Sequence, residues 1–159
     1  MPLADVSSRY TDLVESVFST AIAGKVWLAT GAFVLAFVQV LTASRRWGKL
    51  KRFVPVSFST SRRIHRWSGR VALLLTLPVI FHCVMILGFE TTDLRVTVHS
   101  IAGSFIYGVV AAKLLVIQHH SRNYPSWVLP VLGGTLAAVL TTLWLTSSLW
   151  YFTNVRFGF

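Results

Sequence analysis

The stretches RVALLLTLPVIFHCVMILGF (residues 70–89) and VTVHSIAGSFIYGVVAAKLLVIQ (residues 96–118), separated by only six residues, decide the fold of this chain. Each contains at least 20 residues and carries almost no charge. A helix rises about 1.5 Å per residue, so runs of this length cross a hydrocarbon core about 30 Å thick. The two stretches are therefore predicted to form a transmembrane helical hairpin.

The composition extends this prediction to all 159 residues, which are expected to form a single membrane domain. Hydrophobic residues make up 54% of the chain and gather in long runs, which is typical of an integral membrane protein. We therefore predict an all-α integral membrane protein, folded as a four-transmembrane-helix bundle. The predicted spans cover about residues 23–43, 67–88, 95–118 and 125–152.

The charged residues predict the orientation in the membrane. The net charge is +10, and the connection at residues 44–66 holds eight Lys or Arg residues and no acid. The positive-inside rule places such a connection in the cytoplasm, and it explains the positive charge without nucleic-acid binding. The five acids then fall on the other side: Asp5, Asp12, Glu15, Glu90 and Asp93. This pattern predicts an N-out, C-out, multi-pass protein of a bacterial cytoplasmic (inner) membrane, in contact with membrane lipid.

Local signals predict where two spans begin and where one bends. Thr60 or Ser61 is suited to cap the second span, and the third span has a good N-cap in Thr92 or Asp93. Pro78 removes a backbone N–H inside the second span and is expected to bend that helix. Such a bend opens room between neighbouring helices.

His82 and His99 are predicted to lie at one depth in the hairpin. In an antiparallel pair, residues at equal depth have numbers with a constant sum, and a turn centred on residues 90–91 sets that sum at 181. The numbers of the two histidines also sum to 181. Ionisable side chains are costly inside a membrane and usually mark a function. Two imidazoles at one depth match the axial ligands of a b-type haem, so haem b held by His82 and His99 is the leading hypothesis.

One haem is favoured over two. A second site would lie near the cytoplasmic side, between His65 and either His119 or His120. Their number sums, 184 and 185, are about one turn out of register with 181. The alternative is that these three histidines are interfacial polar side chains among arginines. The single cysteine excludes an internal disulfide or a Cys-ligated cluster within this chain.

Three further residues are candidates for contact with a cofactor. Arg66 lies in the predicted headgroup region and is suited to neutralise a haem propionate. Lys113 lies inside the third span, where it either snorkels to the headgroups or binds a propionate or a quinone headgroup. Gly103 follows His99 by one turn on the same face, and it permits close approach of a porphyrin edge or of another helix.

Several of these motifs resemble a known group of membrane proteins. HRWSGR (residues 65–70), His82 and HSIAG (residues 99–103) resemble small multi-helix b-type cytochromes and ferric-reductase-like membrane domains. In those families, H-R-x-x-G and H-x-x-x-G elements carry haem-ligating histidines, which implies His65, His82 and His99 as ligands here. The stretches ALLLTLPVIFHC, VHSIAGSFIYG and WLTSSLW are also similar to an uncharacterised four-helix membrane family of actinobacteria.

The sequence thus predicts a b-type cytochrome-like electron-transfer protein or subunit of a respiratory chain. It would pass electrons between the quinone pool, or partner subunits of a redox complex, and an acceptor near the outer face. The sequence contains no pattern of catalytic residues, so an electron-transfer component is expected rather than a complete enzyme. The alternative is a cofactor-free accessory or scaffold subunit of a larger respiratory complex, a role favoured by the small-residue patch at Gly133 and Gly134.

Overall fold

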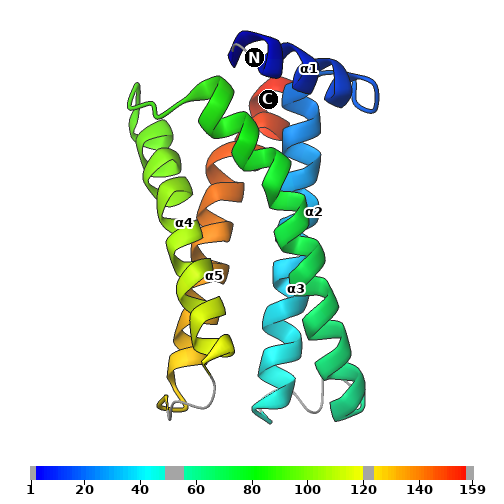
Figure 1. The fold of residues 1–159 in the computed structure, drawn as a ribbon, viewed down its shortest axis with the longest axis vertical. Helices are drawn as coiled ribbons and strands as arrows, with labels where there is room; N and C mark the ends of the chain where they lie inside the picture. The colour runs from blue at the N-terminus through cyan, green and yellow to red at the C-terminus, as the bar shows by residue number, and fades with distance from the viewer. Residues whose placement is uncertain (1–2, 49–55, 120–123, 157–159) are drawn as a thin grey trace.

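The structure is a computed structural model that describes residues 3–48, 56–119 and 124–156, and every regular element in these ranges is helical (Figure 1). The elements are α1 (Leu3–Glu15), α2 (Ala21–Arg46), α3 (Phe58–Phe81), the π-helix η1 (His82–Leu87), α4 (Leu94–Gln118), α5 (Val128–Trp144), and the π-helices η2 (Leu145–Leu149) and η3 (Phe152–Arg156). Four helical stretches are long and apolar enough to cross a membrane: Ala21–Arg45, Phe58–Leu87, Leu94–Gln118 and Val128–Val155. The prediction of an all-α, four-span membrane protein is confirmed.

The helix caps show where two of the spans begin. The prediction of a cap at Thr60 or Ser61 is wrong, because the Ser57 hydroxyl caps α3 by accepting a hydrogen bond from the Thr60 N–H at 3.1 Å. The helix therefore begins at Phe58 and includes polar residues before residue 67, where hydropathy alone places the start of the span. In contrast, α4 begins as predicted, with Asp93 Oδ1 accepting from the Val96 N–H at 2.8 Å.

The four long helices form two antiparallel pairs, α2 with α3 and α4 with α5. The pairs are joined along α2 and α5, whereas α3 and α4 make little direct contact within the described residues. The turn at residues 88–93 connects the two arms of the predicted hairpin, and the arms are splayed (Figure 1). This separation leaves room between the pairs for the cavity described below.

Polar side chains hold α2 against α3. Gln39 Nε2 donates to the His65 carbonyl oxygen and to Ser68 Oγ, the latter at 2.6 Å. Thr42 Oγ1 lies 2.9 Å from His65 Nδ1, and Ser61 Oγ donates to the Thr42 carbonyl at 3.2 Å. Ser61 and Ser68 are buried. Lipid tails are as apolar as the surface of a helix, so the hydrophobic effect does not drive helices together in a membrane. Close packing of small residues and hydrogen bonds between helices do so instead.

Trp144 joins the two helix pairs. Its indole Nε1 donates to Thr30 Oγ1 on α2 at 3.0 Å. Its ring stacks on Phe33, also on α2, with ring centroids 4.6 Å apart and planes 10° apart. One turn further along, Ser148 Oγ donates to the Val26 carbonyl at 3.4 Å. The contact between the pairs is therefore concentrated on one face of α2.

The amphipathic helix α1 lies across one end of the bundle and packs on the start of α2 (Figure 1). Val14 is buried there, and a Cβ added to Gly24 would lie only 2.5 Å from Val14 Cγ1. The Tyr10 hydroxyl donates to the Pro78 carbonyl of α3 at 2.9 Å. Burial raises the pKa of Tyr10, so the hydroxyl keeps the proton that it donates.

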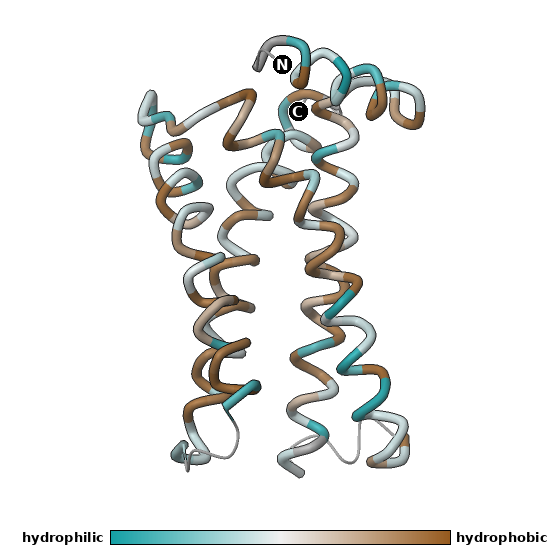
Figure 2. Tube along the Cα trace, viewed as in Figure 1, coloured by the Kyte–Doolittle hydropathy of each residue, from teal (hydrophilic) through white to brown (hydrophobic). Residues whose placement is uncertain are grey.

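Charged and apolar residues are segregated along the bundle. Figure 2 shows mainly hydrophobic residues along the four long helices and hydrophilic residues near both ends. The end that carries α1, the 88–93 turn and η3, here called the α1 end, holds all five acids of the chain. At the opposite end α2 and α4 end, and α3 and α5 begin. The side of the membrane that each end faces stays a prediction.

We expect Gly24→Ala to displace α1. The new Cβ meets Val14, and overpacking of this kind costs about 1–3 kcal/mol. Limited proteolysis of the detergent-solubilised protein should then cleave the chain between α1 and α2 faster than in the wild type. Gly134→Ala is the matched control, because a Cβ at that position has no atom within 4 Å. Equal cleavage rates in the two variants would contradict the close contact of α1 with α2.

Candidate functional site

A cavity of about 350 Å³ lies between the two helix pairs, in the space where α3 and α4 are splayed. We call it the membrane cavity. Its volume falls within the range of sites that bind small molecules, about 300–1,000 Å³. Its walls come from all four spans: Ala29, Thr76, Val79, Ile80, Cys83, Val84, Gly88, Phe89, His99, Ser100, Gly103, Ser104, Ile106, Tyr107, Leu140, Leu143, Trp144 and Ser147.

The lining is mostly apolar, and several of its polar groups are already engaged. The Tyr107 hydroxyl donates to the Thr76 carbonyl at 3.2 Å, and the Trp144 indole is bonded to α2. Gly103 borders the cavity, and a Cβ there would have its nearest neighbour, Leu143 Cδ2, at 3.9 Å. This glycine therefore leaves room inside the cavity rather than allowing another helix to approach.

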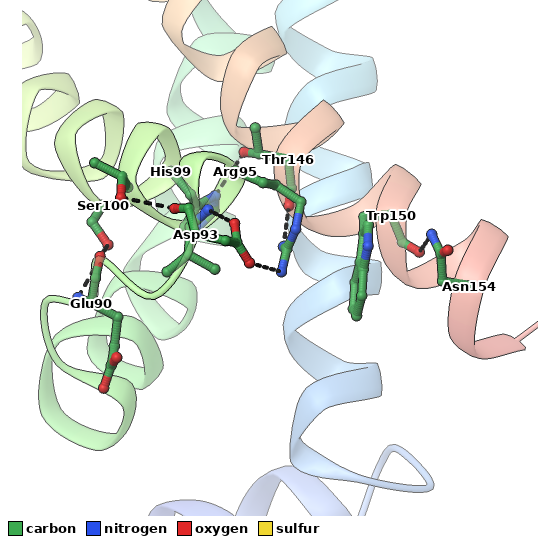
Figure 3. Close-up of polar contacts among 10 residues, drawn as sticks. Glu90, Asp93, Arg95, His99, Ser100, Thr146, Trp150 and Asn154 are labelled. Carbon is green, nitrogen blue, oxygen red and sulfur yellow. Dashed lines mark hydrogen bonds and ion pairs between the residues drawn. The ribbon is translucent and has the colours of Figure 1, made fainter.

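His99 is the histidine that lines this cavity. Its Nδ1 lies 2.9 Å from Thr146 Oγ1, and the Thr146 hydroxyl donates to the Thr142 carbonyl at 2.7 Å (Figure 3). Since that hydroxyl uses its proton on the carbonyl, its oxygen accepts from the imidazole, which fixes the tautomer with hydrogen on Nδ1. The lone pair of His99 then lies on Nε2. Metal-ligating histidines are oriented in this way, by a hydrogen bond from the second ring nitrogen.

The imidazole of His82 is buried and makes no hydrogen bond with the described residues. Its side chain is 3% exposed, and neither ring nitrogen has a partner among them. Aromatic rings cover it: the Tyr10 ring centroid lies 5.9 Å from that of the imidazole and 4.8 Å from that of Phe81. An imidazole with both nitrogens unpaired in a buried site costs free energy. The role of this side chain is therefore not explained by the hydrogen bonding of the fold.

His82 borders neither the membrane cavity nor the vestibule described next, although its neighbour Cys83 borders both. Successive residues of a helix point about 100° apart, so the face that presents Thr76, Val79 and Cys83 to the cavity turns His82 aside. η1 ends at Leu87 and α4 begins at Leu94, so the turn lies where the sequence predicts it, and the equal depth of the two histidines stays a prediction. The cavity linings separate the two side chains, because His99 borders both cavities and His82 borders neither.

A second cavity of about 370 Å³, here called the vestibule, adjoins the membrane cavity at the α1 end. Arg95 Nη1 donates to the Thr146 carbonyl at 2.8 Å, and its guanidinium carbon lies 4.2 Å from the centre of the Trp150 ring (Figure 3). Arg95 Nη2 also lies 3.8 Å from Asp93 Oδ2. The vestibule is lined by Lys25, Cys83, Leu87, Gly88, Glu90, Thr92, Arg95, Val96, His99, Ser100, Thr146 and Ser147.

The structure does not bring the predicted second pair of histidines together. His65 Nδ1 is bonded to Thr42 in the seam between α2 and α3. His119 is exposed at the end of α4, where its Nδ1 lies 3.0 Å from the Leu115 carbonyl of its own helix. The start of α3 and the end of α4 lie apart at the end of the molecule opposite α1 (Figure 1). His120 lies outside the described residues.

The two predicted propionate partners lie away from both cavities. Arg66 is exposed on α3 and belongs to neither lining. Lys113 packs toward α5, where its Nζ lies 3.9 Å from the position that a Gly133 Cβ would take. The membrane cavity and the vestibule are instead approached by other cations, Lys25 and Arg95.

Sequence reasoning missed the contribution of the last span. Thr146 and Arg95 were not singled out, yet Thr146 is bonded to His99, Arg95 is bonded to Thr146, and both border the vestibule. The sum of residue numbers could have pointed to Thr146, if it had been applied to the antiparallel pair of α4 and α5. α4 ends at Gln118 and α5 begins at Val128, and these numbers sum to 246. The numbers of His99 and Thr146 sum to 245, which places them at nearly equal depth.

The comparison with known families covers almost the whole chain. The family model of DUF6529, described as a family of unknown function, matches residues 5–159. The chain belongs to this family. No curated protein and no solved structure matches it. The match spans α1 and all four long helices, so both cavities lie inside the region common to DUF6529 proteins. The resemblance to b-type cytochromes stays a prediction.

We expect His82→Leu to leave the haem-free protein as stable as the wild type or more stable. The substitution removes a buried polar group without partners, whose burial costs about 1–3 kcal/mol, and keeps an apolar side chain in its place. Thermal unfolding in detergent measures the effect. His65→Leu is the control, because its imidazole is bonded to Thr42 and its loss should lower the unfolding temperature. Equal destabilisation by both variants would mean that His82 serves the fold.

Proposed function

We propose that this protein is a membrane electron-transfer component that binds one haem b, with His99 and His82 as axial ligands. The observation that carries the proposal is the buried imidazole of His82, whose two nitrogens lack hydrogen-bond partners among the described residues. Evolution rarely leaves such a group buried without a ligand or a reaction to serve. Ligation to a haem iron would engage the lone-pair nitrogen of each imidazole and so offset part of the cost of burying His82.

His99 and the lining of the membrane cavity fit this group, whereas His82 fits it only after a change of side-chain direction. His99 has its Nδ1 held by Thr146, which leaves the Nε2 lone pair for a metal. The membrane cavity supplies an apolar space bordered by all four spans, and Gly103 keeps one wall free of a side chain. His82 lies at the edge of this space, one residue before Cys83, and ligation requires its ring to turn toward the cavity.

When bound, the haem supplies one-electron oxidation and reduction; the protein supplies position and surroundings. Thr146 orients the imidazole of His99 through its hydroxyl. The aromatic cover of Tyr10 and Phe81 keeps water from His82. The apolar lining lowers the local dielectric constant, which disfavours a gain of net charge at the iron and so influences the potential.

The location of the site suggests how electrons would enter and leave. Both histidines lie near the α1 end, which the charge distribution assigns to the outer face of a bacterial cytoplasmic membrane. A quinone in the membrane, or a partner subunit of a redox complex, would then exchange electrons with the haem. Protease digestion of α1 in intact cells, but not of the α2–α3 connection, would support this orientation.

The decisive measurement is the dithionite-reduced minus oxidised visible spectrum of the detergent-purified protein, with haem quantified as the pyridine haemochrome. We expect about one haem b per chain in the wild type. His99→Ala and His82→Ala should each lose or strongly alter the b-type spectrum, because each removes an axial ligand. His119→Ala should leave it unchanged, since His119 is exposed at the far end of α4.

Each other outcome of this experiment has a distinct meaning. A spectrum lost in His99→Ala and kept in His82→Ala would leave His99 as the ligand and overturn the paired site. Two haems per chain would return His65 and His119 or His120 to consideration. A wild type that stays colourless after haem-supplemented expression would refute haem binding and favour the cofactor-free subunit, to be pursued by co-purification of its partner.

The cavity can be tested without touching a histidine. Gly103→Leu places a side chain in the open space of the membrane cavity, so we expect it to reduce the bound haem severalfold without unfolding the protein. Gly108→Leu is the matched control on the same helix, because Gly108 is exposed and has no atom within 4 Å of an added Cβ. Equal haem content in the two variants would place the haem elsewhere.

A further inference from the structure

The membrane cavity and the vestibule adjoin each other. They share five lining residues, Cys83, Gly88, His99, Ser100 and Ser147. The two chambers differ in chemistry, because the membrane cavity is mostly apolar whereas the vestibule is bordered by Lys25 and Arg95. Together they form one space with an apolar body and a cationic mouth. Such a shape fits a molecule that is apolar over most of its surface and carries anionic groups at one edge.

The two cations at this mouth are not neutralised in the same way. Lys25 is half-buried and has no hydrogen bond or ion pair with any described residue. Arg95 has a distant pairing with Asp93, at 3.8 Å, and uses one of its five N–H donors on the Thr146 carbonyl. Glu90 also borders the vestibule, but its carboxylate points away from Arg95 and His99 (Figure 3). Lys25 and Arg95 therefore keep N–H donors that an anion in the vestibule can accept from.

The helix ends add to this positive potential. Both α2 and α4 begin at the α1 end, α2 about one turn before Lys25 and α4 one residue before Arg95. The N-terminus of a helix carries about half a positive charge from its aligned peptide dipoles. Near a membrane surface, where the dielectric constant is lower than in water, such charges act over longer distances. Two helix ends and two cationic side chains thus surround the same space.

We propose that the joined chambers form one site for an apolar molecule with carboxylate groups, and that Lys25 and Arg95 bind the carboxylates. On the function proposed above, on which this inference rests, the molecule is the porphyrin and the carboxylates are its two propionates. The propionates then face the α1 end. Arg66 and Lys113, the partners expected from the sequence, border neither chamber and are not part of this site.

The same chemistry explains why a cationic mouth would lie at the α1 end at all. By the charge distribution this end is the outer one, where the positive-inside rule does not favour Lys and Arg. Lys25 and Arg95 also lie near helix N-termini, where cations are disfavoured by the helix dipole. The positive-inside rule and the helix dipole both disfavour a cation at these two positions. Binding of an anionic ligand would explain why Lys25 and Arg95 are nevertheless there.

The test uses metal-free protoporphyrin IX and its dimethyl ester, which lacks the two carboxylates, on the full-length haem-free protein in detergent. Porphyrin emission follows binding, so the assay does not depend on iron or on electron transfer. We expect the wild type to bind the free acid about tenfold or more tightly than the ester, the usual effect of a charge-assisted hydrogen bond. Lys25→Gln and Lys25→Gln/Arg95→Gln should progressively lose this preference and bind the ester as the wild type does.

Two variants keep the test interpretable. Arg95→Gln also removes the bond to the Thr146 carbonyl and can affect folding, whereas Lys25 makes no such contact, so Lys25→Gln alone is decisive. Arg70→Gln is the matched control, because Arg70 is exposed on α3, stacks on Trp67 and borders neither chamber. Arg70→Gln should retain the full preference for the free acid.

The outcomes separate this inference from the proposed function. Equal affinity for acid and ester in the wild type, or an unchanged preference in Lys25→Gln, would overturn the carboxylate site. A phospholipid retained by the wild type in native mass spectrometry and lost in Lys25→Gln would overturn it as well, by assigning the cations to a lipid phosphate. A preserved acid preference, together with a haem spectrum indifferent to His82→Ala and His99→Ala, would keep the carboxylate site and refute the axial ligation.

Discussion

The contact of Trp144 with α2 determines the shape of this molecule. The indole donates to Thr30 and stacks on Phe33, and together with the Ser148 bond to Val26 these contacts join the two helix pairs. Because the contact lies on α2 and α5, the opposite helices α3 and α4 stay apart, and the space between them is the membrane cavity. A bundle joined symmetrically through all four helices would have filled this space with side chains.

The membrane makes each polar group in that space significant. In water, a lone imidazole or ammonium is solvated at little cost, whereas inside hydrocarbon it needs a partner. The fold provides partners for most of these groups: His65 has Thr42, His99 has Thr146, and Tyr107 has a backbone carbonyl. His82 is the exception among the described histidines, and the function proposed here follows from that exception.

The constant-sum rule explains how much of the site could be predicted. The depth of a residue in an antiparallel pair depends only on where the turn lies, and turn residues are easily recognised, so His82 and His99 were placed at one level. The direction of a side chain depends on how each helix is rotated about its axis. Pro78 and the π-helical turn that begins at His82 change the hydrogen-bond pattern in that region, and periodicity of 3.6 residues does not predict such a turn.

The sequence by itself determined the four spans and the segregation of acids and bases, and it predicted a common depth for the two histidines. These properties follow from hydropathy, charge and turn position, which are local along the chain. The tertiary structure decided which residues share the cavity, bringing Thr146 to His99, turning His82 toward Tyr10, and placing Lys25 and Arg95 at the mouth. Those choices depend on which helices are neighbours and how each is rotated, and in a membrane they are set by a few polar contacts far apart in the sequence.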